Sequence, residues 1–566
     1  MRIESRVLPE QLPDLGDLPP LLTRLYAARG VRSARELDRS LRALLPWNLL
    51  KGIDRAVQVL RQALEQRQSI LIVGDFDCDG ATASAVAVLG PREMGAARVD
   101  YLVPNRFEYG YGLTPEIVEV ALQRQPDVLV TVDNGISSVE GVAAARAAGL
   151  RVVVTDHHLP GAQLPEADAI VNPSQPGCDF PSKAIAGVGV IFYVLMALRA
   201  ALREDGWFSP ARPEPNLGEL LDLVALGTVA DVVPLDANNR ILVHQGLARI
   251  RAGRCRPGIR ALLEVARRPA ERLASTDLGF IIGPRLNAAG RLDDMSLGIE
   301  CLLTDDEQAA RDMAGELDSL NRDRKAIEQG MQQQALQMLD SASLQESELP
   351  FGLCLFDPQW HQGVIGILAP RLKERYHRPV IAFADAGDGQ IKGSARSIAG
   401  LHIRDALDSV AAANPGLISK FGGHAMAAGL SLPAVHFEAF CQAFDQEVRR
   451  QLSAEDLTGR LLCDGELAAE EFSLQLAAAL RDAGPWGQHF PEPGFHGEFT
   501  LIQQRLVGER HLKLVLQPPG SAEVLDAIAF NVDTQVWPDP NIRRAHLVYS
   551  LDVNEYRGRQ SLQLMV

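Results

Sequence analysis

The stretch SILIVGDFDCDGATASAVAVLG, residues 69–90, joins an apolar run to a helix of small residues through a turn that carries three aspartates. The run SILIV predicts a buried strand. Asp75, Asp77 and Asp79 then lie at the carboxyl end of that strand, where open α/β sheets bind ligands. A calcium loop of the EF-hand type is excluded, because Val86 stands where that loop needs a glutamate and the flanks are not two helices. Pro91 predicts that the helix ends early or kinks.

Strand and helix patterns alternate from about residue 50 to residue 240, which predicts a mostly parallel sheet covered by helices. The runs that predict strands are SILIV (69–73), VDYLV (99–103), DVLVTV (127–132), RVVVT (151–155) and DAIV (168–171). Polar residues follow two of them: Asp133 after the third run, and Asp156, His157 and His158 after the fourth. Asp231 follows the apolar run LVALGTVA. In a parallel sheet, the groups that follow the strands converge on one edge.

Such a cluster of carboxylates predicts a metal site. Each aspartate by itself is typical of a helix cap or a turn, but like charges at short range repel and raise one another's pKa unless cations neutralise them. Oxygen ligands with one imidazole suit Mn²⁺ or Mg²⁺, and the number of carboxylates indicates two ions. We expect Asp133 to bridge them and His158 to orient a phosphate. The expected chemistry is hydrolysis of an anionic ester, since the sequence holds no P-loop motif and no Ser-His-Asp arrangement.

The composition is that of a globular protein, with 46% hydrophobic and 23% charged residues. The sequence shows no run that predicts a membrane span and no signal peptide, and its seven scattered cysteines favour reduced thiols in the cytoplasm. The net charge of −16 is unusual for a protein that coats nucleic acid. Residues 249–291 are the exception, with ten arginines and three acidic residues. This segment could follow a phosphate backbone, although a solvated helical face is the better interpretation for most of its arginines.

The remaining segments predict further domains. Residues 1–48 are rich in proline and leucine and predict a small helical lead-in. A charged segment near 304–343 predicts a long connecting helix, and a second α/β unit follows from about 350 to 450. From about residue 459 the pattern changes to strands separated by turns, which predicts a small barrel.

The ordered motifs resemble a known family. DFDCDG (75–80), VDNG (132–135), TDHH (155–158) and GTVADVVPL (227–235) resemble the successive motifs of the DHH phosphoesterase superfamily. GPRLNAAGRL (283–292), KGSARS (392–397) and FGGHAMAAG (421–429) extend the resemblance to the RecJ exonucleases. It covers nearly the whole chain, and the ordered series is far more specific than one D-x-D-x-D-G match.

The resemblance implies an α/β, multidomain fold. Its parts would be a parallel-sheet DHH catalytic domain at 49–250, an arginine-rich segment and connector helix at 251–345, an α/β DHH-associated domain at 346–452 and a C-terminal OB-fold at 459–566. The implied activity is metal-dependent 5′-to-3′ hydrolysis of single-stranded DNA to 5′-mononucleotides by a two-metal mechanism, in DNA repair and recombination. A monomer is expected. A single-strand-binding protein and a helicase are expected as partners by analogy only.

The family's site residues carry over to matching positions of this sequence. Asp75, Asp77 and Asp133 would hold one ion, and Asp79, Asp133, His157 and Asp231 the other, with Asp133, His157 and His158 catalytic. Asp156 would orient a histidine. The residues implied to contact substrate are Arg106, Arg285, Asn287, Arg291, Ser394, Arg396, Gly422, Gly423 and His424.

Two other functions stay open at this point. The chain could be a DHH phosphoesterase that cleaves short oligonucleotides or cyclic dinucleotides, although the connector and the β-rich tail disfavour small substrates. It could also be a binding protein that keeps the fold as a scaffold. A scaffold would be expected to lose ligands, whereas all the expected acids and both histidines are present.

Overall fold

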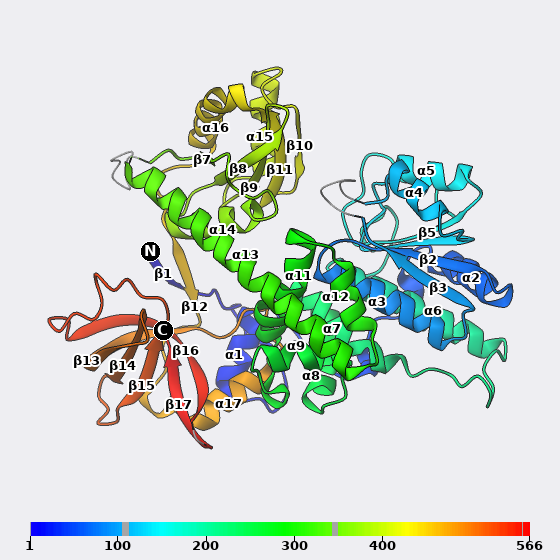
Figure 1. The fold of residues 1–566 in the computed structure, drawn as a ribbon. Coiled ribbons are helices and arrows are strands. Elements are labelled where there is room, and N and C mark those ends of the chain that lie inside the picture. Colours follow the sequence, from blue (N-terminus) through cyan, green and yellow to red (C-terminus); the bar gives the residue numbers. More distant parts are fainter. Residues whose placement is uncertain (1, 105–111, 342–348, 557) are drawn as a thin grey trace. The chain divides into compact units, whose positions relative to one another are not determined.

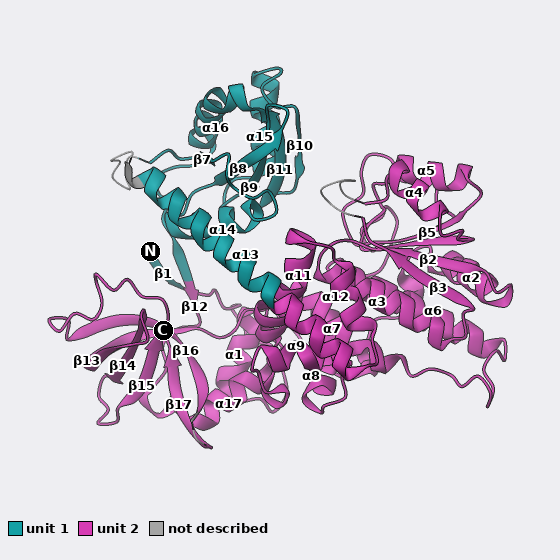
Figure 2. Cartoon of the chain, in the orientation of Figure 1, with its two compact units in different colours: residues 1–4, 319–461 teal, residues 5–318, 462–566 magenta. Residues whose placement is uncertain are grey.

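The computed structural model describes residues 2–104, 112–341, 349–556 and 558–566. The chain forms two compact units: unit 1 contains residues 1–4 and 319–461, and unit 2 contains residues 5–318 and 462–566 (Figure 2). Within the described ranges, no helix has the length and the apolar character needed to cross a membrane.

Unit 2 contains the predicted parallel sheet (Figure 1). Its strand order is β3-β2-β4-β5-β6, and every neighbouring pair is parallel. The bounds are Ser69–Val73 (β2), Arg98–Leu102 (β3), Val128–Val132 (β4), Arg151–Thr155 (β5) and Ala169–Val171 (β6). Strands β4 and β5 are almost wholly buried, which matches their continuous Val and Leu content. The prediction of an α/β fold with a parallel sheet is confirmed.

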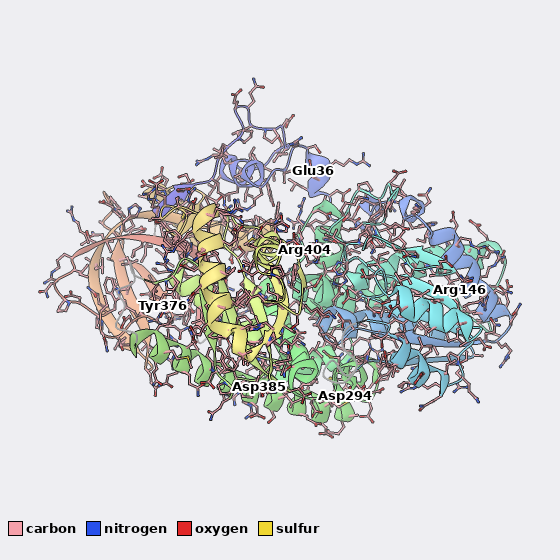
Figure 3. All side chains as sticks on the ribbon, turned by 90° about the horizontal axis from the view of Figure 1, so that it is seen from above. Glu36, Arg146, Asp294, Tyr376, Asp385 and Arg404 are labelled. Atoms are coloured by element: carbon pink, nitrogen blue, oxygen red, sulfur yellow. The ribbon has the colours of Figure 1, made fainter. Side chains whose placement is uncertain are left out.

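Helices cover both faces of this sheet. On one face, Leu71 and Val73 of β2 share a core with α4 (Pro115–Leu122) and α5 (Val139–Ala147). The outer side of α5 is exposed, as Arg146 shows in Figure 3. The helices α2 (Ile53–Glu65), α3 (Cys78–Glu93), α6 (Gly187–Glu204) and α7 (Leu221–Ala230) pack together beside the sheet.

Helix α3 corrects the expectation that it ends early at Pro91. It does not end before Pro91 but continues through that residue to Glu93. Residues 78–91 are all buried, because small side chains let α6 and α7 approach closely. This burial outweighs the backbone hydrogen bond that a proline removes near the helix end.

Further helices follow α7 in unit 2. They are α8 (Ala237–Arg251), α9 (Pro257–Val265), α11 (Gly283–Leu292) and α12 (Ser296–Leu303), with a π-helical turn at Leu278–Ile282 before α11. The long connector is α13, Glu307–Ser341, and the division between the units falls inside it.

The end of unit 2 is a closed barrel with the strand order β13-β14-β15-β17-β16. The bounds are Phe495–Val507 (β13), His511–Gln517 (β14), Leu525–Ala529 (β15), Arg544–Tyr556 (β16) and Arg559–Met565 (β17). Alternate residues of β13 and β16 point inward, including Phe495, Phe499 and Tyr549. The predicted C-terminal barrel is therefore confirmed.

Unit 1 holds a mixed sheet in the order β10-β11-β9-β8-β7. The strands are Leu353–Phe356 (β7), Val380–Gly387 (β8), Gln390–Arg396 (β9), Lys420–Gly423 (β10) and Ala427–Pro433 (β11). Helices α14 (Ile365–Tyr376), α15 (Ile403–Ala413) and α16 (Phe437–Gln451) accompany it, and Tyr376, Asp385 and Arg404 mark parts of this unit in Figure 3.

The lead-in differs from the helical expectation. It contains helix α1 (Pro20–Ala28), but its first residues form strand β1 (Arg2–Ser5), which pairs with β12 (Arg460–Cys463). The Arg2 N–H donates to the Gly459 carbonyl at 2.7 Å. A partner more than 450 residues away in the sequence leaves no local signal for this strand.

Candidate metal centre

The acidic residues that follow the strands of unit 2 come together at the carboxyl edge of the parallel sheet. Asp75 follows β2, Asp133 follows β4, and His157 follows β5. Asp231 joins them from the end of α7. Three of these segments meet because parallel strands all end on the same edge, and the end of α7 brings the fourth to the same place.

His157 lies at the centre of this cluster. Its Nε2 atom is 3.1 Å from Asp133 Oδ1, 3.5 Å from Asp231 Oδ2 and 4.0 Å from Asp79 Oδ2. Three sets of side chains each place their ligand atoms within 4.8 Å of one another. The sets are Asp75, Asp77 and Asp133; Asp79, His157 and Asp231; and Asp133, His157 and His158.

Backbone donors hold the most buried carboxylate. The Gly187 N–H donates to Asp79 Oδ2 at 2.7 Å, and the Val188 N–H donates to Asp79 Oδ1 at 2.9 Å. Both donors belong to the first turn of α6, whose positive dipole end favours an anion. Neither residue was predicted from the sequence. The run AGVGV at 186–190 was the available signal, since its glycines indicate close backbone approach.

Glycines also allow the surrounding helices to pack tightly on the site. A Cβ atom at Gly187 would lie 2.6 Å from Asp133 Oδ1, and one at Gly227 would lie 2.8 Å from Asp79 Oδ1. A Cβ atom at Gly290 of α11 would overlap the carbonyl oxygen of Phe76, inside the aspartate turn. The absence of a side chain at these glycines leaves room for the carboxylates and for the aspartate turn.

We expect Gly290→Ala to lower the free energy of unfolding by about 1–3 kcal/mol and to weaken Mn²⁺ binding. The added methyl group meets backbone rather than a flexible side-chain end, so α11 or the aspartate turn has to shift. Urea unfolding and Mn²⁺ titration measure the two effects.

The matched control is Gly315→Ala in α13, where a Cβ atom meets nothing within 4 Å. This change should stabilise the chain by about 0.5–1 kcal/mol, because alanine is the better helix former. Equal behaviour of the two variants would contradict the close-packing role of Gly290.

Burial and mutual repulsion change the pKa values of the carboxylates. Burial, followed by the charge of Asp77, raises the pKa of Asp79 to about 7. Burial, followed by the charge of Asp79, raises the pKa of both Asp133 and Asp231 well above the ordinary value. Burial lowers the pKa of His157 to about 4, helped by the charge of His158, so His157 is neutral at pH 7 and its nitrogen is free to act as a ligand.

The second histidine is held differently. His158 Nδ1 lies 2.8 Å from Asp156 Oδ1. Burial opposes the charged imidazole, but the hydrogen bond to Asp156 and its negative charge raise the pKa of His158 to about 9. Asp156 Oδ2 also accepts the Ile136 N–H at 2.9 Å, which anchors this carboxylate to the loop after β4. His158 is therefore cationic at neutral pH.

The donor set fits divalent cations. Asp79, Asp133 and Asp231 cannot all be ionised in so small a volume at neutral pH, as their raised pKa values show, unless positive charge compensates them. Carboxylate oxygens with a single neutral imidazole suit Mn²⁺ or Mg²⁺. Among the described residues, these sets of ligands contain no thiol, and burial raises the pKa of the nearby Cys78.

The predicted substrate residues of unit 2 have structural partners. Asn287 Oδ1 accepts the Cys78 N–H at 2.8 Å and so supports the aspartate turn. Arg285 Nε donates to Asp318 Oδ1 at 2.9 Å, and the Arg285 side chain is largely buried. Arg291 is partly buried on α11. Arg106 lies outside the described residues.

The arginines of residues 249–291 mostly bind to the protein itself. Arg256 pairs with Asp305, Arg260 with Glu307, and Arg272 with Glu555. Arg251 Nε donates to the Leu273 carbonyl at 2.8 Å. The interpretation of these arginines as a solvated helical face is therefore incomplete, because several of the side chains bind neighbouring segments of unit 2.

Three of the predicted substrate residues of unit 1, Ser394, Arg396 and Gly422, lie on one face of its sheet. Gly429 of β11 lies opposite Ser394 of β9 on one side and opposite Gly422 of β10 on the other. These three residues therefore share one face of the sheet. Arg396 follows Ser394 at the next position of that face and donates to Ser394 Oγ at 3.1 Å. Gly423 has a φ of +146°, which favours glycine. His424 is exposed, and its N–H donates to Ala427 O at 2.8 Å.

Comparison with family models finds three matches along the chain. The DHH family, N-terminal domain, matches residues 69–228, the DHHA1 domain matches residues 349–450, and the RecJ OB domain matches residues 463–566. These ranges fall within the limits that we propose for the three domains, 49–250, 346–452 and 459–566.

Relatives match over nearly the full length. The chain is 61% identical to the single-stranded-DNA-specific exonuclease RecJ of Dickeya dadantii over 557 residues, which are 98% of this chain and 96% of the relative. It is 58% identical to the protein of that name from Escherichia coli K12, over 100% of this chain and 98% of the relative.

Solved structures agree. The crystal structure of RecJ in complex with Mn²⁺ from Thermus thermophilus matches with a TM-score of 0.81 at 31% identity, covering 100% of this chain and 78% of the other. The complex with Mg²⁺ from the same organism matches with a TM-score of 0.75 at 30% identity, covering 100% of this chain and 77% of the other.

Proposed function

This chain belongs to the RecJ family of single-stranded-DNA-specific exonucleases, and from that premise we propose how its residues perform the reaction. The enzyme is an exonuclease that acts on single-stranded DNA with Mn²⁺ or Mg²⁺ as cofactor. We propose 5′-to-3′ polarity and release of 5′-mononucleotides. The polarity and the product rest on the family resemblance. The observation that carries metal-dependent hydrolysis is the convergence of five aspartates and two histidines in one cluster.

Two overlapping sets of ligands are available. Asp75, Asp77 and Asp133 would hold one cation, and Asp79, Asp133, His157 and Asp231 would hold a second. The grouping of ligand atoms within 4.8 Å supports Asp75, Asp77 and Asp133 as one set and Asp79, His157 and Asp231 as another. Asp133 is assigned to the second set as well because its Oδ1 lies 3.1 Å from His157 Nε2. When bound, such cations lower the pKa of a water ligand and neutralise charge on a phosphoryl oxygen.

The neighbouring residues supply orientation and charge. The α6 backbone fixes Asp79, and Asn287 fixes the turn that carries Asp77 and Asp79. Asp156 fixes the ring of His158 and keeps it cationic, so that His158 donates to a phosphate oxygen of the scissile diester. The raised pKa of His158 favours this donor role over a role as general base at neutral pH.

Other residues would bind the DNA strand. Arg291 on α11 lies close in sequence to Asn287, and we propose that it contacts a backbone phosphate. In unit 1, Ser394, Arg396, Gly422, Gly423 and His424 would bind the nucleotide. Arg285 is better placed as a structural residue, since Asp318 and the Ile281 carbonyl occupy its guanidinium.

The partners other than DNA are part of the proposal. A single-strand-binding protein and a helicase would supply unpaired DNA, and we propose a monomer that works in the cytoplasm in repair and recombination. The seven free cysteines agree with a reducing compartment.

The first experiment uses one oligonucleotide labelled at either end, with Mn²⁺ or Mg²⁺. We expect the 5′-labelled strand to release a labelled mononucleotide at once and the 3′-labelled strand to shorten gradually. Blunt duplex of the same sequence is the control and should survive. Survival of the long strand together with cleavage of dinucleotides or cyclic dinucleotides would move the chain to the small-substrate function.

The pH dependence tests the role of His158. The exonuclease rate should fall as the pH rises through about 9, where His158 loses its proton. In Asp156→Asn this fall should move to lower pH, because the carboxylate that holds the proton is gone while burial still disfavours the cation. The measurement is the exonuclease rate as a function of pH from 6 to 10 at saturating Mn²⁺. If the rate of the variant fell at the same high pH as that of the unaltered enzyme, the role of His158 as a cationic donor would be contradicted.

A further inference from the structure

A second group of metal-binding side chains lies on the C-terminal barrel, away from the aspartate turn in the sequence. Glu466, His496 and His546 place one ligand atom each within 4.8 Å of the others. His496 Nδ1 is 3.0 Å from His546 Nε2 and 3.5 Å from Glu466 Oε1. The nuclease reaction proposed above uses none of these residues.

The strand register brings the two histidines together. In the pairing of β13 with β16, His496 lies opposite Val548 and Glu498 lies opposite His546. His496 and His546 are therefore diagonal neighbours on one face of the strand pair. Phe495, Phe499 and Tyr549 fill the barrel interior, so the histidines face outward, with Glu498 beside them.

The carboxylate comes from the segment that enters the barrel after β12. The His496 N–H donates to the Gly465 carbonyl at 3.1 Å, and the Asp464 N–H donates to the Gly494 carbonyl at 2.6 Å. Residues 464–466 thus run beside the start of β13. Arg29 donates to both Asp464 oxygens at 2.9 Å and fixes this segment from the other side.

The separations match a tetrahedral ion. Metal–nitrogen bonds of about 2.0–2.1 Å in a tetrahedral site place two ligand atoms about 3.3–3.4 Å apart. The two separations at His496, 3.0 and 3.5 Å, lie on either side of that value. Two imidazoles and one carboxylate form a donor set typical of Zn²⁺ and unlike the oxygen-rich set at the sheet edge.

We propose that Glu466, His496 and His546 bind one divalent transition ion of the Zn²⁺ type. Three protein ligands leave one position to water or to a neighbouring side chain. The ion fastens residues 464–466 to the outer face of β13 and β16, and so stabilises the junction between β12 and the barrel. The inference does not depend on the nuclease function.

The competing explanation is a plain hydrogen bond between the two imidazoles, with Glu466 attracted to the charged form of either ring. Such a pair has the same separation of 3.0 Å but binds no ion. Only ion binding distinguishes the two.

The test uses Co²⁺ as the probe on the full chain, because tetrahedral coordination gives Co²⁺ a strong visible spectrum. We compare the unaltered protein with His546→Gln and Glu466→Gln, and we count equivalents bound by equilibrium dialysis. We expect one equivalent fewer, and loss of the visible band, in His546→Gln. Glu466→Gln should weaken binding at this site at least about tenfold.

The control is His489→Asn, which removes another exposed histidine of unit 2 and suits its φ of +58°. It should bind as much Co²⁺ as the unaltered protein. Zn²⁺ should raise the melting temperature of the unaltered protein and of the control more than that of His546→Gln. Glu466→Gln keeps the test valid if His546→Gln misfolds, because the Glu466 side chain is 66% exposed. Equal stoichiometry and equal spectra in all four proteins would overturn the proposal.

Discussion

Asp133→Asn should lower kcat/KM for single-stranded DNA by at least about a thousandfold. Asp133 belongs to both proposed ligand sets, so its loss disturbs both cations, whose stabilisation of the transition state amounts to several kcal/mol. Asparagine keeps the shape of the side chain and tolerates the φ of +60° at this position, where alanine would add strain. Single-turnover degradation of a 5′-labelled strand measures the loss.

The matched control is Asp127→Asn, the same chemical change at the amino end of the same strand. Asp127 is exposed and accepts the Ser69 N–H at 2.7 Å, far from the carboxyl edge in the register of the sheet. Its activity should stay within about threefold of the unaltered enzyme.

Metal-free Asp133→Asn should be at least as stable as the unaltered chain, since it removes a buried carboxylate whose pKa burial and like charges raise. If Asp133→Asn kept the activity of the unaltered enzyme, Asp133 would not be part of the metal centre.

The strands were predictable where local pattern decides structure. SILIV and RVVVT form β2 and β5 at the residues predicted, because apolar β-branched runs suit strands wherever they occur. The convergence of Asp75, Asp133 and His157 was also predictable, since parallel strands end on one edge.

The remaining features depend on contacts between distant segments. No pattern near Gly187 identifies Asp79 as the acceptor of its N–H. Likewise, no pattern near Gly290 indicates that α11 packs on Phe76. Strand β1 depends on a partner at residues 460–463. The arginines after residue 249 suggested a phosphate track, yet pairing with residues such as Asp305 and Glu555 decides where most of them lie.

The stability of the metal-free protein should fall as the pH rises from about 5 to 8. Burial and like charges raise the pKa of Asp79 from 3.8 to about 7, and they also raise those of Asp133 and Asp231 well above the ordinary value. Between their unfolded and folded pKa values these three carboxyl groups bind more protons in the folded chain, so their contribution to the free energy of unfolding decreases with increasing pH. His157, whose pKa burial lowers from 6.5 to about 4, opposes this slope below about pH 6.5, but it is one group against three. Because one pKa unit corresponds to about 1.4 kcal/mol, the melting temperature should drop by on the order of 10 °C.

Saturating Mn²⁺ should reverse this slope, because cations bind the ionised carboxylates and release protons, so that binding strengthens as the pH rises. Thermal melts at pH 5, 6, 7 and 8, with a chelator or with Mn²⁺, measure both slopes. Asp79→Asn should flatten the metal-free dependence of the melting temperature on pH. The asparagine amide that then faces the Gly187 and Val188 N–H groups does not titrate. A metal-free chain whose stability rises from pH 5 to 8 would show that these carboxylates ionise without cations, and would contradict the electrostatic basis of the metal centre.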